Sequence, residues 1–148
     1  MTLTASSEAP AFPLTGDFLA GRLRQNLSLD DLKYIEGLVD TVAEYGDTAR
    51  LLARGTKTDR STILIEGYIF RTIESAGKRF ITGIHVPGDF VDLHGFALKR
   101  LDHNIDAAGR VTVGSVSHDT LRRVMRDRPG VARAMWFATL LDAAIHRK

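Results

Sequence analysis

The sequence predicts a mainly-β domain, an antiparallel barrel or sandwich with two short helices before it and one long helix after it. Glycines at positions 46, 55, 67, 77 and 88 place a turn signal every 9 to 12 residues. The runs between them are rich in Ile, Val, Phe, Tyr and Thr, which favour strands. Short strands at regular spacing are typical of an antiparallel barrel or sandwich. The predicted strands are Ser61–Glu66, Tyr68–Ser75, Arg79–Val86 and Arg110–Val116, with a hairpin turn at Ser75–Lys78.

The composition is that of one globular domain and excludes several classes of function. The chain has 148 residues, of which 44% are hydrophobic and 26% charged, enough for a single core. It has no cysteine, which excludes disulfides, thiolate-held clusters and thiol catalysis. The polar leader and the absence of an 18-residue apolar run indicate neither a secretion signal nor a membrane span, so we expect a cytoplasmic protein. A net charge of +2 without a basic stripe does not indicate a nucleic-acid surface on this segment.

The N-terminal part reads as a flexible leader over residues 1–14 followed by the two short helices. Thr15 or Asp17 is the predicted cap of the first helix, in which leucines recur every four residues. Ser28 is the predicted cap of the second helix. The leucines of the first helix are Leu19, Leu23 and Leu27, and the apolar face of the second holds Leu32, Ile35, Val39 and Val42.

The C-terminal part predicts two more helices, one from the cap Ser117 to about Asp127 and one beginning at Pro129, a favourable first helical position. The last helix is apolar over more than half of its circumference, whereas covering one small barrel requires a single apolar stripe. The extra face predicts a homodimer paired through this helix. We place the dimer contacts at Met135, Ala138, Leu141 and Ile145. No helix stop signal precedes Lys148, so we expect residues 129–148 to begin a longer dimerisation helix, truncated before a further domain.

Several motifs in this order resemble one known family. They are Leu51–Gly55, Ile65–Arg71, Ala76–Arg79 and the turn Pro87–Phe90. Together they make residues 15–128 similar to the cyclic-nucleotide-binding-like domain of Crp/Fnr-type transcription regulators. The resemblance implies a double-stranded β-helix (jelly roll), dimerisation through the long helix, and a helix-turn-helix domain that binds DNA in the parent protein.

The resemblance also implies an effector pocket in the segment after the Pro-Gly-Asp-Phe turn. A bound phosphate requires backbone N–H groups and an arginine. Asp92 and Leu93 stand where the family has glycine and glutamate, and Arg100 could supply the arginine only in a shifted register. The cyclic-nucleotide pattern is therefore incomplete, and the effector is a cyclic nucleotide, another small molecule or none. The candidate pocket residues are Gly88, Asp89, Phe90, Leu93, His94, Gly95, Arg100 and His103.

Two other classes of protein remain open at this point. A metal-dependent jelly-roll enzyme of the cupin kind would carry a His-x-His pair, which the five histidines do not form. No catalytic constellation is recognisable, so we expect no enzyme and assign no metal site. A cyclic-nucleotide-binding module of another signalling protein, such as a kinase or a channel, is the second alternative.

Overall fold

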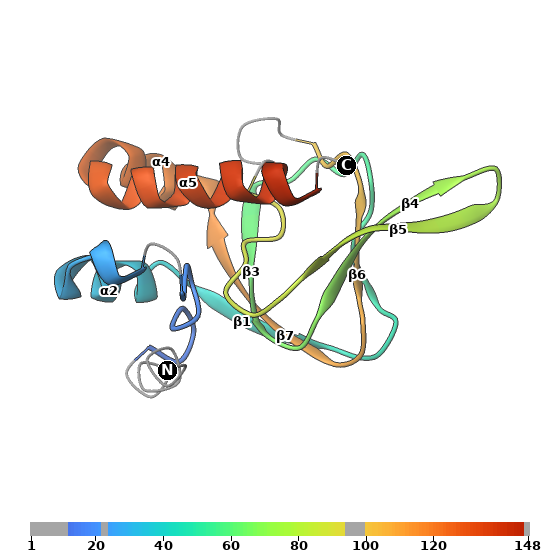
Figure 1. The fold of residues 1–148 in the computed structure, drawn as a ribbon, viewed down its shortest axis with the longest axis horizontal. Coiled ribbons are helices and arrows are strands. Elements are labelled where there is room, and N and C mark those ends of the chain that lie inside the picture. The colour runs from blue at the N-terminus through green and yellow to red at the C-terminus, as the bar shows by residue number, and fades with distance from the viewer. Residues whose placement is uncertain (1–11, 22–23, 94–99, 147–148) are drawn as a thin grey trace.

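The computed structural model describes residues 12–21, 24–93 and 100–146. In these ranges the chain forms two antiparallel sheets and a group of helices. Helices α2 and α4 lie at one end of the strands, and the β4–β5 hairpin projects at the other (Figure 1). The elements are η1 (Arg24–Asn26), α2 (Leu29–Glu36), β1 (Thr41–Tyr45), β2 (Arg50–Leu52), β3 (Arg60–Glu66), β4 (Ile69–Ser75), β5 (Lys78–His85), β6 (Asn104–Ala107), β7 (Val111–Ser117), α4 (His118–Asp127) and α5 (Pro129–His146).

The two sheets have the strand orders β1-β7-β3 and β2-β6-β4-β5. Every pairing in them is antiparallel. A bulge between Arg71 and Thr72 interrupts the register of β4 with β5, so residues on the two sides of it must be assigned to faces separately. The prediction of a mainly-β domain with two antiparallel layers is confirmed.

Two apolar clusters fill the molecule, one between the sheets and one under the helices. Leu64 belongs to the cluster that also holds Ile69 and Ile105 of the four-stranded sheet. Its neighbour Ile63 belongs to the cluster formed with α2, α4 and α5. Successive strand residues point to opposite faces. Strand β3 therefore has both faces covered, whereas the residues of β1 at the edge of the same sheet are exposed.

The predicted strands and the hairpin turn agree with the structure to within one residue at each end. In the turn between β4 and β5, Ala76 and Gly77 have φ angles of 54° and 76°. Two successive positive φ angles are the geometry of a two-residue hairpin turn that follows the twist of its strands. Three strands had no separate prediction, namely β1, β2 and β6, and the last two have three and four residues.

The predicted first N-terminal helix is wrong. Residues 13–21 form successive turns, and only the 3-10 helix η1 follows. Leu19 has a φ of 56° and Gly21 a φ of 74°, which is the left-handed region, and no α-helix continues through it. Glu36 fixes this segment by accepting hydrogen bonds from the backbone N–H groups of Leu14 and Thr15, at 3.0 and 2.9 Å. Tertiary contacts thus override the leucine spacing.

The predicted first residues of the other helices are confirmed. Ser28 caps α2 by accepting from the N–H of Asp31 at 3.0 Å, and Ser117 caps α4 by accepting from Thr120 at 3.2 Å. The structure ends α2 at Glu36, so Val39 and Val42 lie outside the helix, and Val42 belongs to β1. Among the described residues, no helix is both long and apolar enough to cross a membrane.

Candidate functional site

The turn that precedes the predicted effector segment is a tight structural turn. Gly88 has a φ of 97°, and a Cβ built on it would lie 2.2 Å from the carbonyl oxygen of Asp17. Only glycine fits this approach. One carboxylate oxygen of Asp89 lies 3.2 Å from Nδ1 of His85 and accepts from the N–H of Val86 at 3.1 Å. Gly88 and Asp89 therefore shape the turn and hold it against the N-terminal segment.

Phe90 and Leu93 pack into the apolar cluster under the helices. Phe90 is 8% exposed and meets the ring of Phe18 edge-on, with ring centres 5.6 Å apart. Leu93 is half-buried against the same cluster, which includes Met135 of α5. These two predicted pocket residues thus connect the effector segment to α5 by apolar contact. His94 and Gly95 lie outside the described residues.

Asp92 is a buried carboxylate in the segment after the Pro87–Phe90 turn. It is 1% exposed, and its Oδ1 accepts from the N–H of Thr62 at 2.6 Å. Its Oδ2 is buried and has no hydrogen-bond partner among the residues that the structure describes. Burial is the dominant cause that raises the pKa of Asp92 to about 7. The carboxylate therefore faces the protein interior.

Arg100 and His103, which precede β6, differ in burial and in their contacts. Arg100 is exposed, and its Nη1 donates to the carbonyl oxygen of Gly55 at 3.0 Å. His103 is 3% exposed, and its Nδ1 lies 3.1 Å from Nη2 of Arg71 and 2.5 Å from a carboxylate oxygen of Asp102. The structure thus brings Arg71 beside His103. The sequence analysis quoted Arg71 only within a strand motif.

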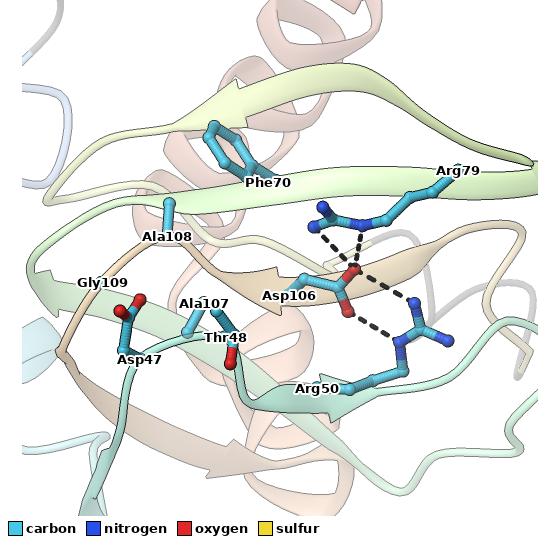
Figure 2. A pocket seen from close by; sticks show the side chains of 9 residues that line it. All are labelled: Asp47, Thr48, Arg50, Phe70, Arg79, Asp106, Ala107, Ala108 and Gly109. Carbon is cyan, nitrogen blue, oxygen red and sulfur yellow. Dashed lines mark hydrogen bonds and ion pairs between the residues drawn. The ribbon is translucent and has the colours of Figure 1, made fainter.

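A second charged cluster lies on the outer face of the same sheet (Figure 2). Asp106 is 3% exposed and accepts from Arg50 Nε at 2.7 Å and from Thr72 Oγ1 at 2.7 Å. Arg79 lies 3.2 Å from the same carboxylate, and Arg50 also contacts Glu74 at 3.3 Å. One carboxylate therefore connects residues of all four strands, β2, β6, β4 and β5.

This outer cluster borders an open hollow of about 660 Å³. Burial alone would raise the pKa of Asp106, but the hydrogen bonds from Arg50 and Thr72 outweigh burial, and the pKa lies below its usual value. Asp106 is therefore ionised and fully engaged at neutral pH. The hollow is lined by Asp47, Thr48, Arg50, Phe70, Arg79, Asp106 and Ala107–Gly109.

The histidines of the described ranges do not gather into a metal site. No group of three or more His, Asp or Glu side chains with metal-ligating geometry occurs within residues 12–21, 24–93 and 100–146. His118 instead lies 3.2 Å from Ser61 Oγ, and His85 contacts Asp89. Both histidines take part in the internal hydrogen bonding of the domain.

Comparison with solved structures shows which fold this is. The chain is similar to the N-terminal domain of a transcriptional regulator from Streptomyces coelicolor A3(2), at 17% identity and a TM-score of 0.67, over 82% of this chain and 86% of that one. It is also similar to the c-di-GMP-responsive global regulator CLP of Xanthomonas campestris, at 11% identity and a TM-score of 0.71. The catabolite activator protein of Thermus thermophilus matches at 12% identity and a TM-score of 0.71.

The chain has the fold of a cyclic-nucleotide-binding domain. The match with the Xanthomonas regulator covers 80% of this chain and 59% of that protein. The match with the Thermus protein covers 84% of this chain and 58% of that protein. The chain therefore spans little more than half the length of these two regulators. No protein-family model and no curated protein matches the sequence.

In this cyclic-nucleotide-binding fold, α5 places its predicted dimer residues in different environments. Met135 is 5% exposed and Ala138 packs on the same intrachain cluster, while Leu141 is half-buried. The side chain of Ile145 lies outside the described residues. Large apolar side chains of α5 that are exposed, among those that the structure describes, include Trp136 at 62%, Phe137 at 36% and Leu140 at 54%.

Proposed function

We propose that this chain is the effector-sensing and dimer-forming domain of a bacterial transcription regulator of the Crp/Fnr type. The fold supports the proposal, because similar structures include the N-terminal domain of a transcriptional regulator and a global regulator of gene expression. In this proposal an effector bound at the barrel, beside the segment from Gly88 to His103, biases the arrangement of α5. The helix relays that state to a DNA-binding domain of the parent protein. Differential affinity of the effector for two arrangements supplies the driving free energy.

The arrangement of apolar residues around α5 carries the proposal. Residues three and four apart share one face of a helix. Val131, Ala134, Met135 and Ala138 follow this spacing and pack on the domain core. Trp136, Phe137 and Leu140 follow it on the opposite side, and all three are exposed. Such an exposed apolar stripe is typical of an interaction surface, and a second copy covers it with the same stripe about a two-fold axis.

Sedimentation velocity tests this pairing. We expect the wild-type chain to be a dimer, and Leu140→Glu to raise the dimer dissociation constant by roughly a hundredfold or more. The reason is that a two-fold interface buries the introduced carboxylate twice. Met125→Glu is the matched control, because Met125 is an apolar side chain that is 50% exposed on α4. This substitution should change the dimer dissociation constant by less than about threefold.

Circular dichroism verifies that both variants are folded. A wild-type chain that stays monomeric at high concentration, or equal effects of the two substitutions, would contradict the proposed dimer.

A further inference from the structure

The hollow beside Asp106 lies on the outer face of the four-stranded sheet. The neighbours of Asp106 in β6, Ile105 and Ala107, belong to the apolar cluster between the sheets. Successive strand residues project to opposite faces, so the carboxylate of Asp106 projects away from the interior of the barrel. The hollow has a volume of about 660 Å³, and small-molecule sites typically have roughly 300–1,000 Å³. It is therefore large enough to hold a small molecule outside the barrel.

The hollow separates opposite charges. Asp47 lies on one side of it, and the guanidinium groups of Arg50 and Arg79 lie on the other (Figure 2). Asp106 lies between the two arginines and is shared by them. Two carboxylates and two guanidinium groups thus line the hollow, and their charges balance. A ligand that complements this lining is neutral overall and carries one charge of each sign.

Arg79 retains a donor for such a ligand, whereas Arg50 does not. All three guanidinium nitrogens of Arg50 are engaged, Nε and Nη2 by Asp106 and Nη1 by Glu74. Arg79 directs Nε and Nη2 to one oxygen of Asp106, at 3.3 and 3.2 Å. Its Nη1 has no hydrogen-bond partner within the described ranges, and its side chain is 45% exposed. A ligand carboxylate can therefore accept from Arg79 while Asp106 stays in place.

Asp47 supplies the opposite charge from the turn between β1 and β2. It is exposed, and no cation in the described part of the chain pairs with it. Thr48 beside it has a φ of 62°, a left-handed conformation that is rare for a β-branched residue. The N–H of Ala107 donates to the carbonyl oxygen of Ala49 at 2.8 Å and fixes this turn against the wall of the hollow. Strained conformations held in this way cluster at ligand sites.

An apolar wall completes the hollow. Phe70 is half-buried and lines it together with Ala107 and Ala108. On β5 the residue directly opposite Phe70 is Ile84, which is 49% exposed. Directly opposite residues of antiparallel strands project to the same face. Ile84 therefore extends the apolar surface from the hollow toward the sheet edge.

We propose that this hollow binds a small zwitterion, with its carboxylate on Arg79, its ammonium group on Asp47 and an apolar group on Phe70. An α-amino acid with an apolar side chain has this chemistry. A simple anion would meet the carboxylate of Asp47, and a simple cation would meet the guanidinium of Arg79. The site is separate from the segment Gly88–His103, so this proposal does not rest on the proposed effector role.

Nuclear magnetic resonance of the full chain, labelled with nitrogen-15 and titrated with L-phenylalanine and L-leucine, tests the proposal. We expect at least one of them to shift the Arg79 Nε–Hε and Gly109 N–H resonances saturably. Arg79→Gln and Asp47→Asn should each weaken binding by roughly tenfold, the loss expected for one charge-assisted contact. The same two changes on α4, Arg122→Gln and Asp119→Asn, are the matched controls and should leave binding within about twofold.

Ligands that lack one charge assign each contact. Phenylpropionate lacks the ammonium group and should bind the wild type more weakly than L-phenylalanine, but in Asp47→Asn the two should bind alike, because that contact is already lost. Phenylethylamine lacks the carboxylate and should show the same relation in Arg79→Gln. If neither amino acid binds saturably at millimolar concentration, if the controls weaken binding equally, or if the losses simply add, the proposal is overturned.

Discussion

The two faces of the β2-β6-β4-β5 sheet each carry arginine and carboxylate groups, but the two clusters differ in how deeply the carboxylate is buried. On the outer face, Asp106 is buried and receives hydrogen bonds from Arg50, Arg79 and Thr72. On the inner face, one nitrogen of His103 is shared by a donor and an acceptor. The side chain of Asp106 is 5% exposed, whereas that of Asp102 is 68% exposed. Water therefore screens the charges of the inner cluster more than those of the outer cluster.

Asp92 provides a third case, a buried carboxylate that receives no arginine in the described part of the chain. Its folded-state pKa is about 7, far above the unfolded value. The folded chain therefore binds more protons than the unfolded chain between about pH 4 and 7, so its stability decreases as pH rises. This sign is opposite to that of Asp106.

The largest expected effect is the pH dependence caused by Asp92. We expect the free energy of unfolding of the wild type to fall by roughly 3 kcal/mol between pH 5 and 8 because of this group. Asp92→Asn removes the titration and should flatten the profile, and chemical denaturation at several pH values measures both. Identical profiles for the two proteins would show that the carboxylate is solvated and that the contrast with Asp106 does not exist.

The next effect tests the outer cluster itself. Asp106→Asn removes the negative charge that Arg50 and Arg79 share, and should reduce the free energy of unfolding by about 2 kcal/mol. The loss is smaller than for a fully buried ion pair because both arginines are more than a third exposed. Asp102→Asn, at a 68% exposed carboxylate of the inner cluster, should lose less than about 1 kcal/mol. Urea unfolding at pH 7 compares them.

The sign of the Asp106 effect with pH is a further check on that variant. Because its folded pKa lies below the unfolded value, the contribution of Asp106 is fully present above about pH 4 and is lost as pH falls through the folded pKa. The difference between wild type and Asp106→Asn should therefore shrink in acid. A difference that grew in acid would contradict the ionised, hydrogen-bonded carboxylate.

The smallest effect ranks the two outer arginines. Arg50 approaches Asp106 at 2.7 Å, whereas the contacts of Arg79 are 3.2 and 3.3 Å long. We expect Arg50→Gln to lower the free energy of unfolding by about 1 kcal/mol and Arg79→Gln by about half of that. Denaturation at low and high salt separates the charge contribution from packing. Equal losses would indicate that Asp106 does not distinguish its two partners.

The layered β architecture could be predicted from the sequence because glycine spacing and β-branched runs act locally. The caps Ser28 and Ser117 and the start of α5 at Pro129 were also predictable, since each depends on its own neighbours. The N-terminal turns were not, because Glu36 fixes them from 21 residues away. Local patterns do not contain such contacts.

The candidate site was less accessible from sequence, since it depends on which face each strand residue occupies. Asp106, for example, projects to the outer face beside Phe70, which its position in the sequence does not indicate. Arg71 was quoted only within a strand motif, and its position opposite Ile105 follows from pairing with β6, a strand that had no separate prediction. A cross-strand register in a bulged sheet is a long-range property, and the structure was needed to define it.

The close approach of Gly88 to the carbonyl oxygen of Asp17 means that a probe on the N-terminal segment can detect movement of the turn after β5. Because the two segments pack together at Gly88, displacement of the turn after β5 would change the surroundings of residues 12–21. Pro13, at the exposed side of this segment, is remote in sequence from every group that we expect to touch an effector. A fluorophore attached there would report movement of the Pro87–Phe90 turn without altering the residues of the turn itself.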